Sequence, residues 1–168
     1  PVWLDIPFDV QSAIININNL ESFDYKKEKY FELKNNFKLN KFFNFLYNSK
    51  KPVIIFGQGI RTSNAINNFK SFLKAYKIPS IAARMGIDIL PYNNNFFFGL
   101  GGMRGHKYSQ KILEESDLII ALGTSFTHAF AGKNYKQYNN KAKFIMVNID
   151  KKEIKKPSLK VDLPIIAN

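Results

Sequence analysis

Apolar positions along most of the chain alternate between two periods, which predicts helices separated by strands. The first helix is indicated by apolar residues at the spacing of one helical face: Leu39, Phe42, Phe43 and Leu46. It ends in the Ser-Lys-Lys-Pro run at 49–52, because the residue before a proline is disfavoured in helical geometry. A β-branched and aromatic run, Val53–Phe56, follows at once. It is typical of a strand buried on both faces of a parallel sheet.

The same alternation continues to the end of the chain. A second helix, with Thr62 or Ser63 as its predicted cap, carries an apolar stripe of Ile66, Phe69, Phe72, Leu73 and Tyr76. Residues 84–105 show no clear period, and we interpret them as a long glycine-bearing excursion. Further strands are expected at Ser80–Ala83, Leu118–Leu122, Phe144–Asn148 and Val161–Ile165, with a helix around Tyr108, Ile112 and Leu113. This order predicts an α/β fold, a Rossmann-like parallel sheet with helices on both faces.

The pattern also suggests three segments. Residues 1–11, "PVWLDIPFDVQ", are apolar and strand-like and begin without an initiator Met or a leader, so we interpret them as the end of a preceding domain of a longer protein. Residues 12–37 mix Asn, Lys and Phe without a period and are expected to form a linker arm. Residues 38–168 would then form the α/β domain.

Composition narrows the function classes. The formal charge of +12 and a pI near 9.8 favour phosphate-rich partners, but the cations are scattered in pairs among Asn and aromatic residues, so we expect no nucleic-acid binding. The chain has no cysteine, which excludes disulfides, zinc–thiolate sites and cysteine nucleophiles. No apolar stretch is long enough to cross a membrane. We therefore expect no membrane partner and a cytoplasmic protein.

Parallel α/β sheets bind ligands outside the carboxyl ends of their strands. That rule selects five loops: Gly57–Gly59, Ala83–Met85, Gly101–Gly105, Gly123–Ser125 and Asn148–Asp150. Glycine would let backbone N–H groups approach a phosphate closely. The dinucleotide fingerprint needs a third glycine where Thr62 stands and an acidic residue at the end of the second strand, where Ala82 and Ala83 stand. Whether Gly57–Gly59 holds a phosphate or only turns the chain therefore stays open.

A series of motifs nevertheless carries a family resemblance. "PVWLDIPFDVQ" resembles the closing phrase of the pyrimidine-binding domain of thiamine-diphosphate enzymes. The later motifs, in order and spacing, are similar to the central domain of those enzymes, most like the acetolactate synthase large (catalytic) subunit group: "KKPVIIFGQGI", "FLKAYKIPSIAARMGIDILP", "FFFGLGGMRG", "ESDLIIALGTSF", "AKFIMVNIDKKEI" and "VDLPI". The resemblance covers nearly the whole chain.

The resemblance implies an architecture and a chemistry for the longer protein. In that family a first domain supplies the glutamate that activates thiamine diphosphate, and a last domain holds the diphosphate through magnesium with a Gly-Asp-Gly motif. This chain contains no Gly-Asp-Gly, so we expect its missing pyrimidine- and diphosphate-binding domains to be its partners and the segment alone to be inactive. The longer protein would be a homodimer or homotetramer. It would act as a transferase or lyase on 2-keto acids such as pyruvate.

Central domains of the family hold FAD, ADP or no nucleotide, so the resemblance also implies a cofactor site here. The residues that match its loops are Gly57, Gln58, Gly59, Arg84, Met85, Gly102, Met103, Gly123 and Asp150. None of them is expected to be catalytic or to bind a metal. Each also has a purely structural interpretation: the glycines turn the chain, the methionines fill gaps and Asp150 caps a helix at Lys151.

One departure from the family pattern bears on the ligand. FAD-using members carry two arginines in the loop after the Leu118–Leu122 strand, where this chain has Ser125 and Ala129. Compensation would have to come from other cations: Arg61, Arg84, Arg104 or Lys133. Because charge-assisted contacts are lost, we expect ADP to bind better than FAD. His106 and His128 give no sign of being ligands.

Two other function classes stay open. The segment would be a free-standing nucleotide-binding module if the gene encodes only these residues, and a nucleic-acid binder if its cations gather on one face. A sirtuin-like deacylase shares a related architecture but normally needs zinc-binding cysteines, which this chain lacks.

Overall fold

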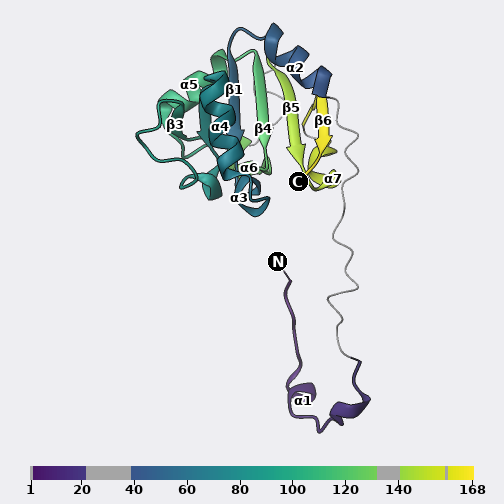
Figure 1. The fold of residues 1–168 in the computed structure, drawn as a ribbon. Helices are drawn as coiled ribbons and strands as arrows, with labels where there is room; N and C mark the ends of the chain where they lie inside the picture. Colours follow the sequence, from purple (N-terminus) through teal and green to yellow (C-terminus); the bar gives the residue numbers. More distant parts are fainter. Residues whose placement is uncertain (1, 22–38, 132–140, 158) are drawn as a thin grey trace. The chain divides into compact units, whose positions relative to one another are not determined.

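A computed structural model describes residues 2–21, 39–131, 141–157 and 159–168 of the chain (Figure 1). The chain divides into two units, Pro1–Glu32 and Leu33–Asn168. In the first unit a short helix α1 (Phe8–Gln11) and a 3-10 turn η1 (Ile17–Asn19) interrupt an otherwise irregular segment, and every residue from 2 to 21 is exposed. Residues 2–11 form no strand within this chain. The expectation that they close the sheet of a preceding domain stays a prediction, and most of the expected linker arm, 22–37, lies outside the described residues.

The second unit alternates strands and helices. Its strands are β1 (Pro52–Phe56), β2 (Ser80–Ala82), β3 (Phe97–Leu100), β4 (Leu118–Leu122), β5 (Lys143–Asn148) and β6 (Leu163–Ile166). Its helices are α2 (Leu39–Asn48), α3 (Gly59–Thr62), α4 (Ile66–Tyr76), the 3-10 turn η3 (Arg84–Gly86), α5 (Lys107–Glu115), α6 (His128–Ala131) and α7 (Lys151–Ile154).

The strands form one sheet in the order β3-β2-β1-β4-β5-β6, and every pairing is parallel. The chain builds outward from β1 to β3 and then crosses back to place β4 on the other side of β1. This is the order of a doubly wound Rossmann-like sheet, with its winding reversing between β1 and β4. The predicted fold class is confirmed.

Alternate residues of each strand point to opposite faces of the sheet and pack into two separate hydrophobic cores, as expected for a sheet covered on both faces. Ile54, Phe56 and Ile120 pack with α2 and α4 on one face, and the rings of Phe56 and Phe69 lie 4.9 Å apart between centroids. Val53 and Ile55 pack on the other face with residues from α5, α6 and α7. The result is three layers, helices over sheet over helices.

Most predicted elements are found, and two local predictions are wrong. The excursion at 84–105 contains a strand, β3, that its sequence did not reveal. Neither Thr62 nor Ser63 caps the helix with the 66–76 stripe. Residues 59–62 form the short helix α3 instead, and α4 begins after Ala65 without a side-chain cap.

Two carboxylates fasten the amino ends of β4 and β5. Asp117 accepts a hydrogen bond from the Ser49 hydroxyl and others from the backbone N–H groups of Lys50 and Lys51, at 2.7 and 3.0 Å. Burial by itself raises the Asp117 pKa, but these donors outweigh it and leave the pKa below its ordinary value. Asp162 likewise accepts from the Phe144 N–H at 2.9 Å and pairs with Lys143. These contacts hold the edge of the sheet opposite the predicted ligand loops.

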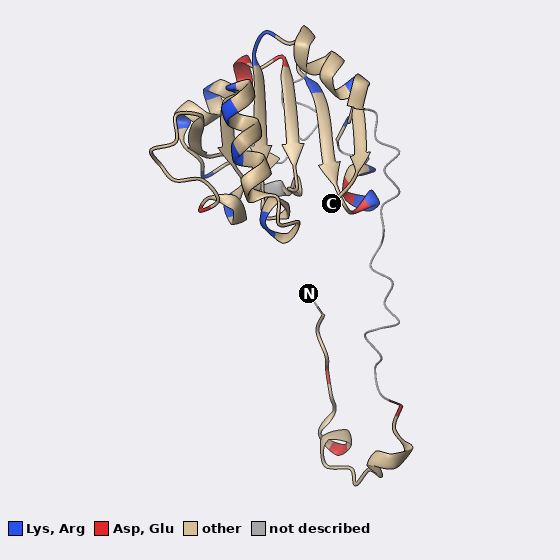
Figure 2. Cartoon of the chain, viewed as in Figure 1, with Lys and Arg blue, Asp and Glu red and all other residues tan. Residues whose placement is uncertain are grey.

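Lysine and arginine lie on several helices and loops of the second unit (Figure 2). No helix among the described residues has the length and apolarity needed to cross a bilayer.

Candidate functional site

The reversal of winding places two glycine-bearing turns side by side at the carboxyl ends of β1 and β4. The first is Gly57–Gly59, between β1 and α3, and the second begins at Gly123, directly after β4 (Figure 1). Open α/β sheets bind ligands in the crevice at this point. The structure therefore brings Gly57, Gln58, Gly59 and Gly123 together. Their role in binding a ligand stays a prediction.

The glycines in these turns let two backbones touch. A Cβ atom placed on Gly59 would lie 2.4 Å from the Cα of Gly123, and one placed on Gly57 would lie 2.7 Å from the carbonyl oxygen of Gly123. Gly123 has a φ of 55°, in the left-handed region that glycine adopts without strain. Any side chain at these positions would push the two loops apart.

Most backbone N–H groups of the first turn donate to backbone carbonyls of the protein. The N–H of Gly57 donates to Leu122 at 3.0 Å and the N–H of Gly59 donates to Gly123 at 2.8 Å. Those of Ile60 and Arg61 donate to the carbonyls of Gly57 and Gln58. Among the described residues, nothing accepts from the N–H of Gln58. Of the donors in the predicted phosphate turn, this one alone is free to bind a ligand.

The loop after β2 lies against the other side of the same turn. A Cβ atom on Gly86, the last residue of η3, would lie 3.1 Å from the Cα of Gly57. Arg61 of α3 bridges the two loops, because its guanidinium donates to the Gln58 side-chain oxygen at 2.6 Å and pairs with Asp88 at 2.7 Å. The ion pair with Arg61 holds the Asp88 pKa below its ordinary value.

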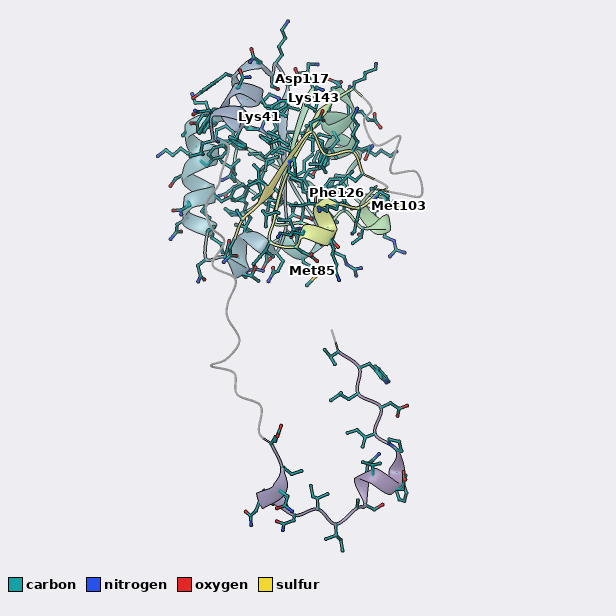
Figure 3. All side chains as sticks on the ribbon, turned by 90° about the vertical axis from the view of Figure 1, so that its right-hand side faces the viewer. Lys41, Met85, Met103, Asp117, Phe126 and Lys143 are labelled. Atoms are coloured by element: carbon teal, nitrogen blue, oxygen red, sulfur yellow. The ribbon has the colours of Figure 1, made fainter. Side chains whose placement is uncertain are left out.

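Arg84 and Met85, the other predicted residues of this loop, are exposed, with Met85 at 68% of its full accessibility. Among the described residues, no hydrogen bond or ion pair engages Arg84. Figure 3 shows Met85 at the end of the second unit opposite Asp117. Both side chains are therefore available to a ligand at the carboxyl edge.

The loop after β3 is closed on itself. Leu100 donates its N–H to the Nδ1 atom of His106 at 3.1 Å and accepts from the His106 N–H at 2.9 Å, so residues 101–105 form a tied loop. Gly102, with a φ of 91°, turns this loop, and Met103 beyond it is 65% exposed. His106 is thus a structural residue, as the sequence suggested.

The loop after β4 places aromatic residues under the sheet and a small polar residue at its surface. Phe126 and Phe130 are buried with their ring centroids 5.2 Å apart, and Ser125 is exposed. No arginine follows this strand, so the loop offers no cation at Ser125. Lys133 and the side chains of His128 and Ala129 lie outside the described residues.

Asp150 follows β5 and caps α7. Its carboxylate accepts from the N–H of Lys152 at 2.8 Å, which confirms the structural interpretation of this residue. Asn148, nine-tenths buried, donates to the Thr124 carbonyl at 3.2 Å and so ties the loops after β4 and β5 together. The sequence does not reveal this contact, because an Asn at a strand end is a weak signal.

No metal centre is visible among the described residues, where no three His, Asp or Glu side chains gather closely enough to hold an ion. The ion pair Arg61–Asp88 joins residues 27 positions apart, and no local pattern could have predicted it. The described carboxyl edge thus combines a closed glycine contact, one free N–H and three arginines, on α3 and in the loops after β2 and β3.

Comparison with known proteins gives a consistent result. Residues 39–168 match the family model described as thiamine pyrophosphate enzyme, central domain. Over 168 residues the chain is 32% identical to the acetolactate synthase large subunit of Lactococcus lactis, covering all of this chain and 29% of that protein.

Two further relatives come from other lineages. Identity is 28% to the probable acetolactate synthase large subunit of Methanococcus aeolicus, covering all of this chain and 28% of that protein. It is 30% to the acetolactate synthase isozyme 1 large subunit of Escherichia coli, covering 93% of this chain and 27% of that protein. The chain therefore spans less than a third of the length of these relatives.

Proposed function

The chain belongs to the family of thiamine pyrophosphate enzyme central domains, and on that premise we propose that it serves in an acetolactate synthase-like carboligase acting on 2-keto acids. The observation that carries this proposal is the similarity of the whole chain to acetolactate synthase large subunits from a bacterium and an archaeon. The activity itself, as a transferase or lyase, is assigned to a longer protein. We expect no residue of this chain to take part in the chemistry.

Thiamine diphosphate would supply the electron sink for decarboxylation in that protein, with magnesium holding the diphosphate. Both would be bound by the pyrimidine- and diphosphate-binding domains. We place the protein in the cytoplasm as a homodimer or homotetramer. The direct test is the product of the complete gene: it should form acetolactate from pyruvate only when thiamine diphosphate and magnesium are both present. A complete gene product with no such dependence would contradict the proposal.

Within that enzyme the domain acts as a scaffold and, we propose, binds an adenine nucleotide at the carboxyl edge. The predicted contacts are Gln58 through its free N–H, Arg84 and Met85 after β2, and Gly102 and Met103 after β3. Gly57, Gly59 and Gly123 contribute by letting the loops close on one another. Asp150 would act indirectly, since its carboxylate already caps α7.

The same contacts favour a small nucleotide over FAD. A glycine turn with one free N–H supplies little binding energy, and the loop after β4 has Ser125 where FAD-using members have arginine. A hydrogen bond to a charged group contributes about 1.5 to 3 kcal/mol, so the loss of two weakens FAD by roughly two to four powers of ten. We expect the 168-residue chain to purify colourless and to prefer ADP.

Isothermal titration of this chain with ADP, FAD and adenosine tests the proposal. ADP should bind more tightly than both FAD and adenosine. A yellow protein, or FAD binding below micromolar concentration, would refute the preference. Binding of no nucleotide at millimolar concentration would leave the domain a scaffold. A free-standing nucleotide-binding module, the alternative function, would require a complete gene that encodes no further domains.

A further inference from the structure

One arginine at the carboxyl edge is already bound to an anion. The guanidinium of Arg61 lies 2.7 Å from a carboxylate oxygen of Asp88 and donates a second hydrogen bond, of 2.6 Å, to the side chain of Gln58. The Arg61 side chain keeps 36% of its accessibility and that of Asp88 keeps 70%. The pair is thus open to solvent and able to exchange partners.

The place that this carboxylate occupies suits a phosphate. A guanidinium binds carboxylate and phosphate oxygens with the same donor geometry, so a bound carboxylate marks a position where a phosphate oxygen fits. Arg61 follows the glycine turn by two residues, and Gln58, which fixes the guanidinium, is the residue with the free N–H. The charged donor and the free backbone donor therefore belong to the same glycine turn and the short helix that follows it.

We propose that Arg61 is the phosphate-binding side chain of the nucleotide site and that Asp88 competes with the ligand for it. The inference rests on the proposed nucleotide site. Asp88 is an internal anion that a diphosphate must displace, and it lowers affinity by the strength of its pair with Arg61. The ligand class is a nucleoside diphosphate or free pyrophosphate, recognised through its phosphate.

The other described arginines fit this role less well. Arg84 and Arg104 are exposed, and among the described residues neither is oriented by a hydrogen bond or an ion pair. An unfixed arginine loses more side-chain entropy on binding than one already held by a neighbour. Arg61 is held in place by Gln58, so releasing Asp88 leaves a pre-oriented cation.

The experiment compares two variants that remove the same charge. Asp88→Asn abolishes the carboxylate that occupies Arg61. Glu115→Gln abolishes one that pairs with Lys51, at 3.1 Å, near the opposite edge of the sheet. Both raise the net charge by one, but only the first frees a guanidinium at the proposed site. Titration calorimetry with ADP, pyrophosphate and adenosine is run on the 168-residue chain, on both variants and on Arg61→Gln.

The pair is exposed to solvent, and exposed ion pairs are weak. Asp88→Asn should therefore tighten ADP by only about threefold to fivefold. Pyrophosphate should tighten as well if phosphate alone is recognised, whereas adenosine should not respond. Glu115→Gln should leave ADP affinity unchanged, and Arg61→Gln should weaken it about tenfold or more.

Two outcomes overturn the inference in different ways. If the unaltered chain binds ADP but Asp88→Asn has no more effect than Glu115→Gln, Asp88 does not compete, although the nucleotide site stands. If neither ADP nor pyrophosphate binds any of the four proteins at millimolar concentration, the proposed nucleotide site fails together with its arginine.

Discussion

Replacing Gly59 by alanine separates the two roles that a glycine turn can have. The added Cβ would lie 2.4 Å from the Cα of Gly123, whereas carbon atoms in ordinary contact are about 3.5 to 4.0 Å apart, so the loops must separate by about 1 to 1.5 Å. That movement breaks the 2.8 Å hydrogen bond from the Gly59 N–H to the Gly123 carbonyl. Overpacking costs about 1 to 3 kcal/mol and the lost hydrogen bond about 1 more, which gives a destabilisation of about 2 to 4 kcal/mol.

Urea unfolding followed by circular dichroism measures this loss. A domain is ordinarily stable by about 5 to 15 kcal/mol, so the variant should still fold, with a clearly lower midpoint and an unchanged slope. Gln58→Ala is the matched control, because it alters the same turn without adding an atom and should cost about 1 kcal/mol or less. A Gly59→Ala chain with the stability of the unaltered chain would refute the packing argument.

Three further predictions concern stability. Asp117→Asn should cost about 1 to 3 kcal/mol, an amount reduced by the partial exposure of the site, because a charged acceptor of three hydrogen bonds is lost. Since the folded-state pKa of Asp117 is lowered, its contribution to folding stability is present above the ordinary carboxyl pKa of about 4. That contribution is lost as pH falls through the folded-state pKa. Urea midpoints of the unaltered chain should therefore fall toward acid pH more steeply than those of Asp117→Asn. Ile120→Ala, at a fully buried position of β4, should cost about 2 to 5 kcal/mol in the same assay, whereas Ile149→Ala, at a position 54% exposed, should stay within about 1 kcal/mol of the unaltered chain. Proteinase K should cut first within residues 2–21, where every residue is exposed and nothing is buried, and early cleavage inside β1 or β4 would contradict this.

The sequence predicted the central strands well, because their signal is local. Leu118–Leu122 was placed with its observed ends, and β1 and β5 each differ by one residue, since unbroken apolar runs leave little choice. Strand β3 could not be predicted from the sequence, because it is only four residues long, contains Gly99 at a φ of 74° and pairs with β2 in a shifted register. The four residues of α3 are too few to show a helical period of apolar residues. The sequence therefore wrongly indicates Thr62 and Ser63 as caps of the next helix.

The predicted site residues do converge on one edge, because strand order fixes where loops meet. The contacts that these residues make at that edge could not be predicted from the sequence. A phosphate-binding turn and a close contact between two loops both require glycine, because neither leaves room for a Cβ atom. Only the acceptor of each N–H group shows which of the two roles the glycines have. In this chain the N–H groups of Gly57 and Gly59 bond to Leu122 and Gly123, and the pairing of Arg61 with Asp88 depends on tertiary structure alone.

Most N–H groups of this glycine turn donate to other backbone carbonyls and are not available to a ligand. The backbone then contributes a fixed and small part of the affinity, and side chains on the surrounding loops must contribute the rest. Such side chains are exposed and carry little of the packing, so they can change without disturbing the sheet. The same central-domain fold can therefore hold different nucleotides or none, and the glycine motif by itself does not indicate which. In the nucleotide site that we propose for this chain, the deciding groups are Arg61, Asp88 and Ser125, since they set the charge around the turn.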